Sequence, residues 1–113
     1  MYTIYHNPRC SKSRQTLELL KQHNIEPTVV LYLDEELTIS KLKEIATLLN
    51  KKAIEFTRTK EAAFKEANLT KESSDDEIFE AMIKFPKLIE RPIVIKGKKA
   101  VLGRPPENVL DLM

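Results

Sequence analysis

The order of segments at the start of the chain constrains the fold more than any other feature. Residues 2–5 (YTIY) are aromatic and β-branched, which favours a strand. Residues 13–24 (SRQTLELLKQHN) place Leu17 and Leu20 on one face at helical spacing. Residues 27–33 (PTVVLYL) are almost all apolar, which predicts a strand buried on both faces. Two strands joined by a helix predict a right-handed βαβ unit with parallel strands.

The rest of the chain predicts an inserted run of helices and then a hairpin. The inserted run comprises a helix over 38–49 with Thr38 as its N-cap, a short helix near 60–67, and a helix after the capping box 74–77 (SDDE) that stops at Pro86. The hairpin comprises strands at 92–95 and 100–103 joined by the turn 96–99, and a short helix over 105–112 follows it. Together these segments predict one α/β domain over residues 1–113, with a four-stranded mixed sheet and an inserted helical region.

Composition excludes several classes of protein. Hydrophobic residues make up 42% of the chain and charged residues 32%, which is typical of a globular domain. The net charge of +2 gives no electrostatic basis for binding nucleic acid, and the basic run 96–99 is explained by a solvated hairpin turn. No apolar run approaches about 20 residues, so no membrane partner is expected.

Cysteine usage indicates the compartment. The chain has a single cysteine, Cys10, which cannot form an internal disulfide. A reducing cytoplasm is therefore the expected location, and the N-terminal residues do not have the pattern of a signal peptide. One cysteine and two histidines match no standard set of metal ligands, so no metal site is expected.

Cys10 lies where the first strand gives way to the first helix, and this position favours a reactive thiol. The unpaired N–H groups of a helix N-terminus stabilise a thiolate and lower the pKa of the thiol. Nearby side chains that add positive charge are Arg9, Lys12 and Arg14, and those that offer hydrogen bonds are Asn7, Ser11 and Ser13. The alternative is a small buried hydrophobic residue, which the polar neighbours disfavour. His6 precedes the thiol by four residues, and is either part of its site or a structural residue at the strand end.

The same helix N-terminus also binds oxyanions, which predicts a small tetrahedral anion or an acidic thiol compound as substrate. Only five of the 19 basic residues are arginines. Three of these, Arg58, Arg91 and Arg104, lie far from Cys10 in sequence, beside a proline or in a predicted loop. Arginine binds tetrahedral oxyanions through a bidentate fork, which lysine lacks. Each could instead be an isolated surface residue, because sequence spacing does not show that the three converge.

Four segments together resemble the glutaredoxin-coupled arsenate reductase (ArsC) family, and equally its short arsenate reductase-like (YfgD-like) branch. These are YHNPRCSKSRQTLELL, EPTVVLYL, LIERPIVI and LGRPPENVLDL, which span nearly the whole chain. The resemblance implies a thioredoxin-like (glutaredoxin-like) fold, with the proline before the third strand, Pro92, in a cis peptide bond.

The resemblance also implies roles for particular residues. Cys10 matches the family's nucleophile, and His6 and Ser13 match residues that help to activate it. The family's anion-binding arginines correspond to Arg58, Arg91 and Arg104. No bound cofactor is implied: arsenate is the substrate, glutathione a co-substrate and glutaredoxin the partner that completes the reduction. The single cysteine agrees with this reading, since reducing equivalents must then come from external thiols.

Two other functions remain open on the same fold. One is an Spx-type regulator that binds RNA polymerase, although many of these carry a Cys-x-x-Cys pair and here the second position is Ser13. The other is a glutathione-linked thiol transferase that forms mixed disulfides on Cys10.

Overall fold

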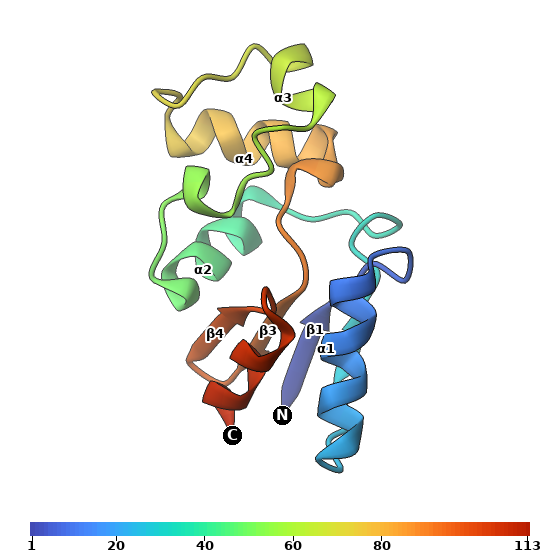
Figure 1. The fold of residues 1–113 in the computed structure, drawn as a ribbon. Coiled ribbons are helices and arrows are strands. Elements are labelled where there is room, and N and C mark those ends of the chain that lie inside the picture. The colour runs from blue at the N-terminus through green and yellow to red at the C-terminus, as the bar shows by residue number, and fades with distance from the viewer. The chain divides into compact units, whose positions relative to one another are not determined.

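The computed structural model describes residues 1–113, and the backbone divides into two compact units. The sheet unit comprises residues 1–35 and 91–113, and the helical unit comprises residues 36–90. The predicted inserted run of helices therefore forms a compact unit of its own, while the prediction of one domain over the whole chain stays a prediction. Figure 1 labels β1, β3, β4 and α1 of the first unit and the helices α2, α3 and α4 of the second.

The sheet unit contains the four strands that the sequence predicts. Its elements are β1 (Tyr2–Tyr5), α1 (Ser11–Gln22), β2 (Thr28–Val30), β3 (Ile93–Lys96), β4 (Lys99–Leu102) and the 3₁₀ helix η3 (Pro106–Leu112). The strands lie in the order β2-β1-β3-β4. β1 pairs with β2 in parallel, whereas β1 with β3 and β3 with β4 are antiparallel. The prediction of a four-stranded mixed sheet is confirmed.

The second strand corrects one expectation. The prediction of a strand over 27–33, buried on both faces, is wrong. β2 covers only Thr28–Val30, and the side chains of Val29, Leu31 and Leu33 are 43%, 37% and 39% exposed. β2 is an edge strand that pairs with β1 alone, and the chain turns immediately after it, with the N–H of Asp34 donating to the carbonyl of Leu31. An apolar run therefore does not by itself place a strand inside a sheet.

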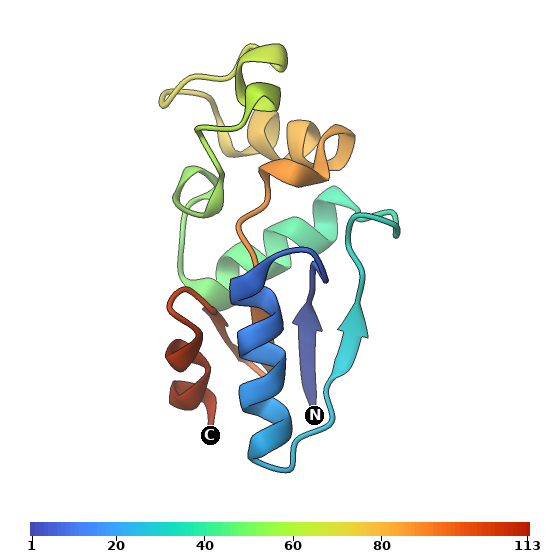
Figure 2. The ribbon, with the colours of Figure 1, turned by 45° about the vertical axis from the view of Figure 1, so that its right-hand side comes forward.

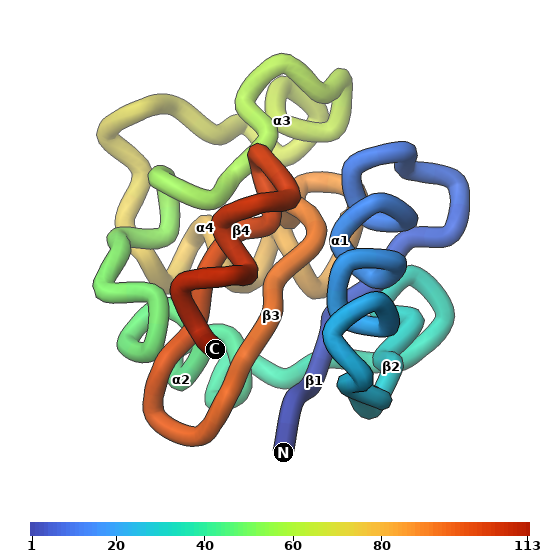
Figure 3. The backbone as a smooth tube through the Cα atoms, turned by 60° about the horizontal axis from the view of Figure 1, so that its bottom comes forward, coloured from blue at the N-terminus to red at the C-terminus, as the bar shows by residue number.

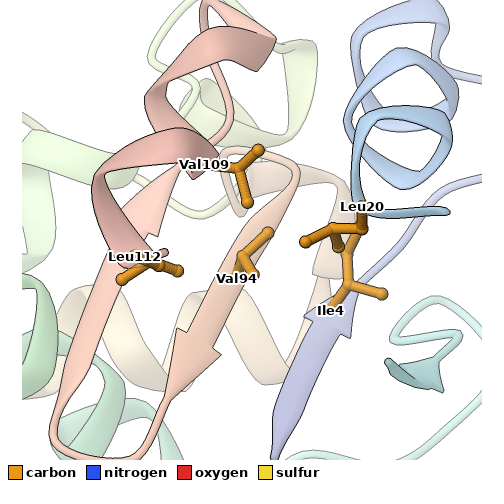
Figure 4. Packing of buried hydrophobic residues seen from close by; sticks show 5 residues of the cluster. All are labelled: Ile4, Leu20, Val94, Val109 and Leu112. Carbon is orange, nitrogen blue, oxygen red and sulfur yellow. The ribbon is translucent and has the colours of Figure 1, made fainter. Parts of the chain in front are cut away.

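A small hydrophobic core fixes α1 and η3 on the same face of the sheet. Leu20 of α1 and Val109 and Leu112 of η3 pack with Ile4 of β1 and Val94 of β3, all at most 5% exposed (Figure 4). Figures 2 and 3 show both helical segments in front of this face. Burying one aliphatic side chain stabilises a fold by about 1.5–3 kcal/mol. This core therefore anchors the helix whose N-terminus carries Cys10.

The C-terminal part of the sheet unit matches its prediction except in helix type. Gly97 has a φ of +58° in the tight turn between β3 and β4, as expected of a hairpin glycine. The last helix is a 3₁₀ helix, with Pro106 in its first turn. The peptide bond before Pro92 is cis, which confirms that expectation, and the bond before Pro105 is cis as well.

The helical unit begins its longer helices with the caps that the sequence predicts. It contains α2 (Ile39–Leu49), η1 (Ala53–Phe56), α3 (Ala62–Glu66), α4 (Asp75–Lys84) and η2 (Pro86–Leu88). The hydroxyl of Thr38 accepts the N–H of Lys41 at 3.1 Å. Ser74 and Glu77 form the reciprocal bonds of a capping box, at 3.2 and 2.9 Å. No helix in the chain combines the length and the apolar character needed to cross a membrane.

Candidate active site

A tight turn places Cys10 at the start of α1. The carbonyl of Asn7 accepts the N–H of Cys10 at 3.0 Å, and the side-chain oxygen of Asn7 accepts the N–H of Arg9 at 3.0 Å. Pro8 occupies the second position of this turn, where its fixed φ is favourable. The turn ends in Cys10 with extended backbone angles, φ −94° and ψ 122°, and Cys10 is thereby the N-cap residue of α1.

The Cys10 thiol occupies the position of a helix-capping side chain, and its pKa is lowered. The thiol is half-buried and makes no standard N-cap hydrogen bond. Burial of the thiol raises its pKa. Three groups lower it: the backbone N–H of Ser13, the Arg91 guanidinium through its hydrogen bond and its charge, and the backbone N–H of Lys12. The net effect is a pKa below the ordinary value of a thiol. A larger share of Cys10 is therefore thiolate, the nucleophilic form, near neutral pH.

The source of positive charge differs from the one expected. The helix N-terminus acts as predicted, through the N–H groups of Ser13 and Lys12. The charge that lowers the pKa of Cys10, however, comes from Arg91 and not from the basic side chains beside it in sequence. Arg14 instead donates to the carbonyl of Pro8 at 2.8 Å, and so supports the turn. Proximity in sequence was a poor guide here, because a charge acts on the sulfur through distance in space.

His6 and Ser13 form a buried, hydrogen-bonded pair. His6 Nδ1 lies 2.6 Å from Ser13 Oγ, which also accepts the N–H of Asn7 at 3.0 Å. Burial, followed by the charges of Lys21 and Arg14, lowers the pKa of His6 and favours its neutral form. The Ser13 hydroxyl can then donate to Nδ1 of the neutral ring. His6 therefore connects to Cys10 through Ser13, whose backbone N–H faces the sulfur.

Two distant arginines reach the same thiol. Arg104 Nη1 lies 4.0 Å from Cys10 Sγ and donates to the carbonyl of Arg91 at 3.4 Å. Arg91 presents a buried Nε that has no hydrogen-bond partner. Buried donors without a partner are rare in folded proteins, and an oxyanion is the natural acceptor for a guanidinium N–H. The sheet unit thus combines a thiol of lowered pKa, a helix N-terminus and two guanidinium groups in one place.

Arg58 lies in the helical unit. The backbone N–H of Arg58 donates to the carbonyl of Leu88 at 2.7 Å, and its side-chain Nη2 lies 3.7 Å from Glu61 Oε1. Its convergence with the other two arginines stays a prediction.

Sequence reasoning missed three residues that hold the segment carrying Arg104. Gly103 precedes this arginine, while Thr16 and Asn108 hydrogen-bond to the segment from α1 and η3. One indication was available, because the chain has only two glycines and Gly103 lies outside the predicted hairpin turn. No pattern in the sequence marked the other two.

The architecture and the site together define the class of protein. A βαβ unit followed by a β-hairpin, with a cysteine at the N-terminus of the first helix, is a thioredoxin-like fold with a single thiol at the candidate active site. Residues 5–112 match the ArsC family, and the chain belongs to this family.

Relatives agree with this assignment over nearly the whole chain. The chain is 49% identical to YfgD of Escherichia coli K12, covering 97% of this chain and 94% of the relative. It is 46% identical to the arsenate reductase of Haemophilus influenzae, covering 97% of both chains. The solved structure of the arsenate reductase from Vibrio cholerae superposes with a TM-score of 0.94 at 46% identity, covering 99% of this chain and 97% of that one. The resemblance stated from the sequence is confirmed.

Proposed function

We propose that this protein is an arsenate reductase that uses the Cys10 thiolate as its nucleophile and takes reducing equivalents from glutathione and glutaredoxin. Relatives of similar length that are named arsenate reductase support the reaction. No bound cofactor takes part, and the expected location remains the cytoplasm. The other two functions considered from the sequence gain no specific support from the site.

The observation that carries the proposal is the buried, unpartnered Nε of Arg91 beside a thiol of lowered pKa. A protein that only exchanged disulfides would need the thiolate, but it would not need a buried guanidinium donor that is available to bind an anion. Arsenate is a tetrahedral oxyanion that accepts several charge-assisted hydrogen bonds at once, each worth about 1.5–3 kcal/mol. Arg91 and Arg104 therefore bind the anion, and a role for Arg58 as a third anion-binding arginine stays a prediction.

The first step joins sulfur to arsenic. The Cys10 thiolate attacks arsenic, and one arsenate oxygen leaves as water after protonation, so arsenic remains in its oxidised state in the adduct. Arg91 and Arg104 balance the negative charge of the remaining oxygens. His6 and Ser13 keep the first turn of α1 in place, so that its N–H groups continue to stabilise the thiolate.

External thiols supply the electrons. The glutathione thiolate attacks Cys10 Sγ, the sulfur–arsenic bond breaks, and its electron pair stays on arsenic, which leaves as arsenite. Cys10 and glutathione then form a mixed disulfide. Glutaredoxin attacks the glutathione sulfur and releases the Cys10 thiolate, and its own mixed disulfide is reduced by further glutathione. The scheme needs one cysteine on this chain, which is the number present.

A coupled assay tests the proposal. Purified protein is incubated with arsenate, glutathione, glutaredoxin, glutathione reductase and NADPH, and arsenate-dependent NADPH oxidation is followed. We expect turnover only when arsenate, glutathione and glutaredoxin are all present, with arsenite formed in proportion to the NADPH consumed.

Omission of single components gives the matched controls. Equal turnover without glutaredoxin would overturn that part of the proposal and leave the nucleophile in place. NADPH oxidation that depends on this protein, proceeds with a small glutathione mixed disulfide in the absence of glutaredoxin, and does not occur with arsenate would favour the thiol transferase instead.

A further inference from the structure

The two arginines at the thiol are attached to residues that contact each other directly. Arg91 immediately precedes Pro92, and Arg104 immediately follows Gly103. The N–H of Gly103 donates to the carbonyl of Pro92 at 2.9 Å. A shift at this contact therefore moves both guanidinium groups relative to Cys10.

Thr16 brings α1 into the same contact. Its hydroxyl lies 2.8 Å from the carbonyl of Lys12 and 3.3 Å from the carbonyl of Gly103. Thr16 is fully buried, and Lys12 lies in the first turn of α1, whose N–H groups face the thiol. Thr16 thus links the turn that stabilises the thiolate to the segment that carries Arg104.

Gly103 leaves no space for a side chain. A Cβ at this position would lie 2.6 Å from Pro92 Cγ, 2.6 Å from Thr16 Oγ1 and 3.1 Å from Thr16 Cγ2. Carbon atoms in contact settle near 3.5–4.0 Å, so any side chain here forces Pro92 and Thr16 away from the loop. Neither neighbour yields easily, because Pro92 is a ring within the backbone and Thr16 is β-branched and buried.

We propose that Gly103 and Thr16 are positioning residues that set the placement of Arg91 and Arg104 against the Cys10 thiol. Neither residue needs to touch the substrate. Their role is to let three segments, the start of α1, the residues before β3 and the residues after β4, approach closely enough for one anion to contact all of them. The arsenate part of this inference rests on the proposed function, whereas the effect on the thiol does not.

The central experiment compares the two glycines of the chain. In Gly103→Ala, the displaced arginines should reduce arsenate kcat/KM by about tenfold to a hundredfold, mainly through KM, as expected for a displacement of about 1 Å. The pKa of Cys10, followed as the midpoint of iodoacetamide alkylation against pH, should rise because Arg91 moves away.

Gly97→Ala is the matched control. It makes the same substitution in the hairpin turn of the same unit, where φ is +58° and no atom lies within 4 Å of the added carbon. This variant should lose stability, since the backbone is unfavourable for alanine. It should keep the parent KM and the parent alkylation midpoint. A role in stability alone would affect the two variants alike.

Thr16 supplies an independent test should Gly103→Ala fail to fold. Thr16→Val keeps the shape but removes the hydroxyl, and should raise KM and the alkylation midpoint. Thr16→Ser keeps the hydroxyl and should behave like the parent. In the Gly103→Ala background, Thr16→Ala removes two of the three close contacts, so the double variant should be less impaired than the sum of the single changes predicts.

Four results would overturn the inference. Two concern the glycines: a folded Gly103→Ala variant with the parent KM and alkylation midpoint, and a Gly97→Ala variant that shifts both as much as Gly103→Ala does. Two concern Thr16: a Thr16→Val variant with the parent KM and alkylation midpoint, which decides even if Gly103→Ala does not fold, and strictly additive effects at Thr16 and Gly103. If the protein reduces no arsenate, the alkylation midpoints still decide whether these residues position Arg91, so failure of the proposed function is distinguished from failure of this inference.

Discussion

The loop before α1 and the loop after β4 both border the Cys10 thiol, but they are held in different ways. The first loop is held by residues close to it in sequence: Asn7 accepts the N–H groups of Arg9 and Cys10, Ser13 accepts the N–H of Asn7, and Arg14 donates to the carbonyl of Pro8. The second loop is held from outside, by the carbonyl of Pro92 and the side chains of Thr16 and Asn108.

This difference separates two functions of the site. The first loop sets the reactivity of the Cys10 thiol, the proposed nucleophile, because it places Cys10 at a helix N-terminus through short-range hydrogen bonds. The second loop sets the position of Arg104, which depends on three other segments of the sheet unit. Changes in the first loop should therefore act on the thiol. Changes around the second loop should act on anion binding, and should reach the thiol only where they also displace Arg91.

The largest effect is expected in the first loop, at the nucleophile itself. Cys10→Ser should abolish arsenate reduction, because a serine hydroxyl is too weak an acid to supply the nucleophile at neutral pH. The turn and α1 should remain folded, since the backbone of Cys10, and not its side chain, makes the hydrogen bonds to Asn7 and Arg14. Activity in the coupled assay and circular dichroism of the same sample check both points. Arsenate reduction above background would contradict the assignment of Cys10.

A large effect confined to anion binding is expected at Arg104. Arg104→Lys keeps the positive charge but loses the bidentate fork, so arsenate kcat/KM should fall by roughly tenfold or more. Alkylation of Cys10 by neutral iodoacetamide should change little, because lysine keeps the positive charge near the sulfur, while the N–H groups of Ser13 and Lys12 and the Arg91 guanidinium continue to lower the pKa of the thiol.

Arg91→Lys is the matched comparison for Arg104→Lys. Arg91 both lowers the pKa of Cys10 and offers a free donor, so this variant should lose arsenate activity and also shift the alkylation profile to higher pH. Identical behaviour of the two lysine variants would show that the arginines do not have separate tasks.

Two asparagines sharpen the comparison further. Asn108 Nδ2 lies 3.1 Å from the carbonyl of Leu102 and 3.2 Å from that of Arg104. Asn108→Ala should raise the arsenate KM by about fivefold, corresponding to about 1 kcal/mol, and leave the alkylation midpoint unchanged. Asn7→Ala should do the opposite, raising the pKa of Cys10 as the turn loosens. If Asn108→Ala and Asn7→Ala changed the arsenate KM and the alkylation midpoint of Cys10 to the same extent, the two loops would not have separate roles.

The smallest effect concerns stability against pH. The folded pKa of Cys10 is lowered, so between that value and about 8.5 the unfolded chain binds a proton that the folded chain lacks. The thiolate therefore contributes stability that is fully present above about pH 8.5 and is lost as the pH falls through the folded pKa. Urea unfolding of the parent and of Cys10→Ser over this range should give a difference that grows with pH, and a flat difference would contradict the lowered pKa.

Local patterns determined much of this protein. Strand-like apolar runs and segments with helical periodicity predicted the order of elements. Thr38 and the pair Ser74 and Glu77 marked the starts of two helices, and the position of Cys10 at the start of α1 was also predicted. These features depend on residues within a few positions of one another. Helix capping, turn formation and side-chain periodicity are decided at that range, and the sequence displays them directly.

Only the tertiary structure decided the rest. The apolar run after residue 27 did not reveal that β2 is an edge strand, because periodicity reports which side chains are apolar and not how many strands lie alongside. Arg9 and Arg14 are closer to Cys10 in sequence than Arg91, yet Arg91 lowers its pKa, because charge acts through distance in space. Gly103 is required where Pro92 and Thr16 meet, and such close packing exists only after three distant segments have come together.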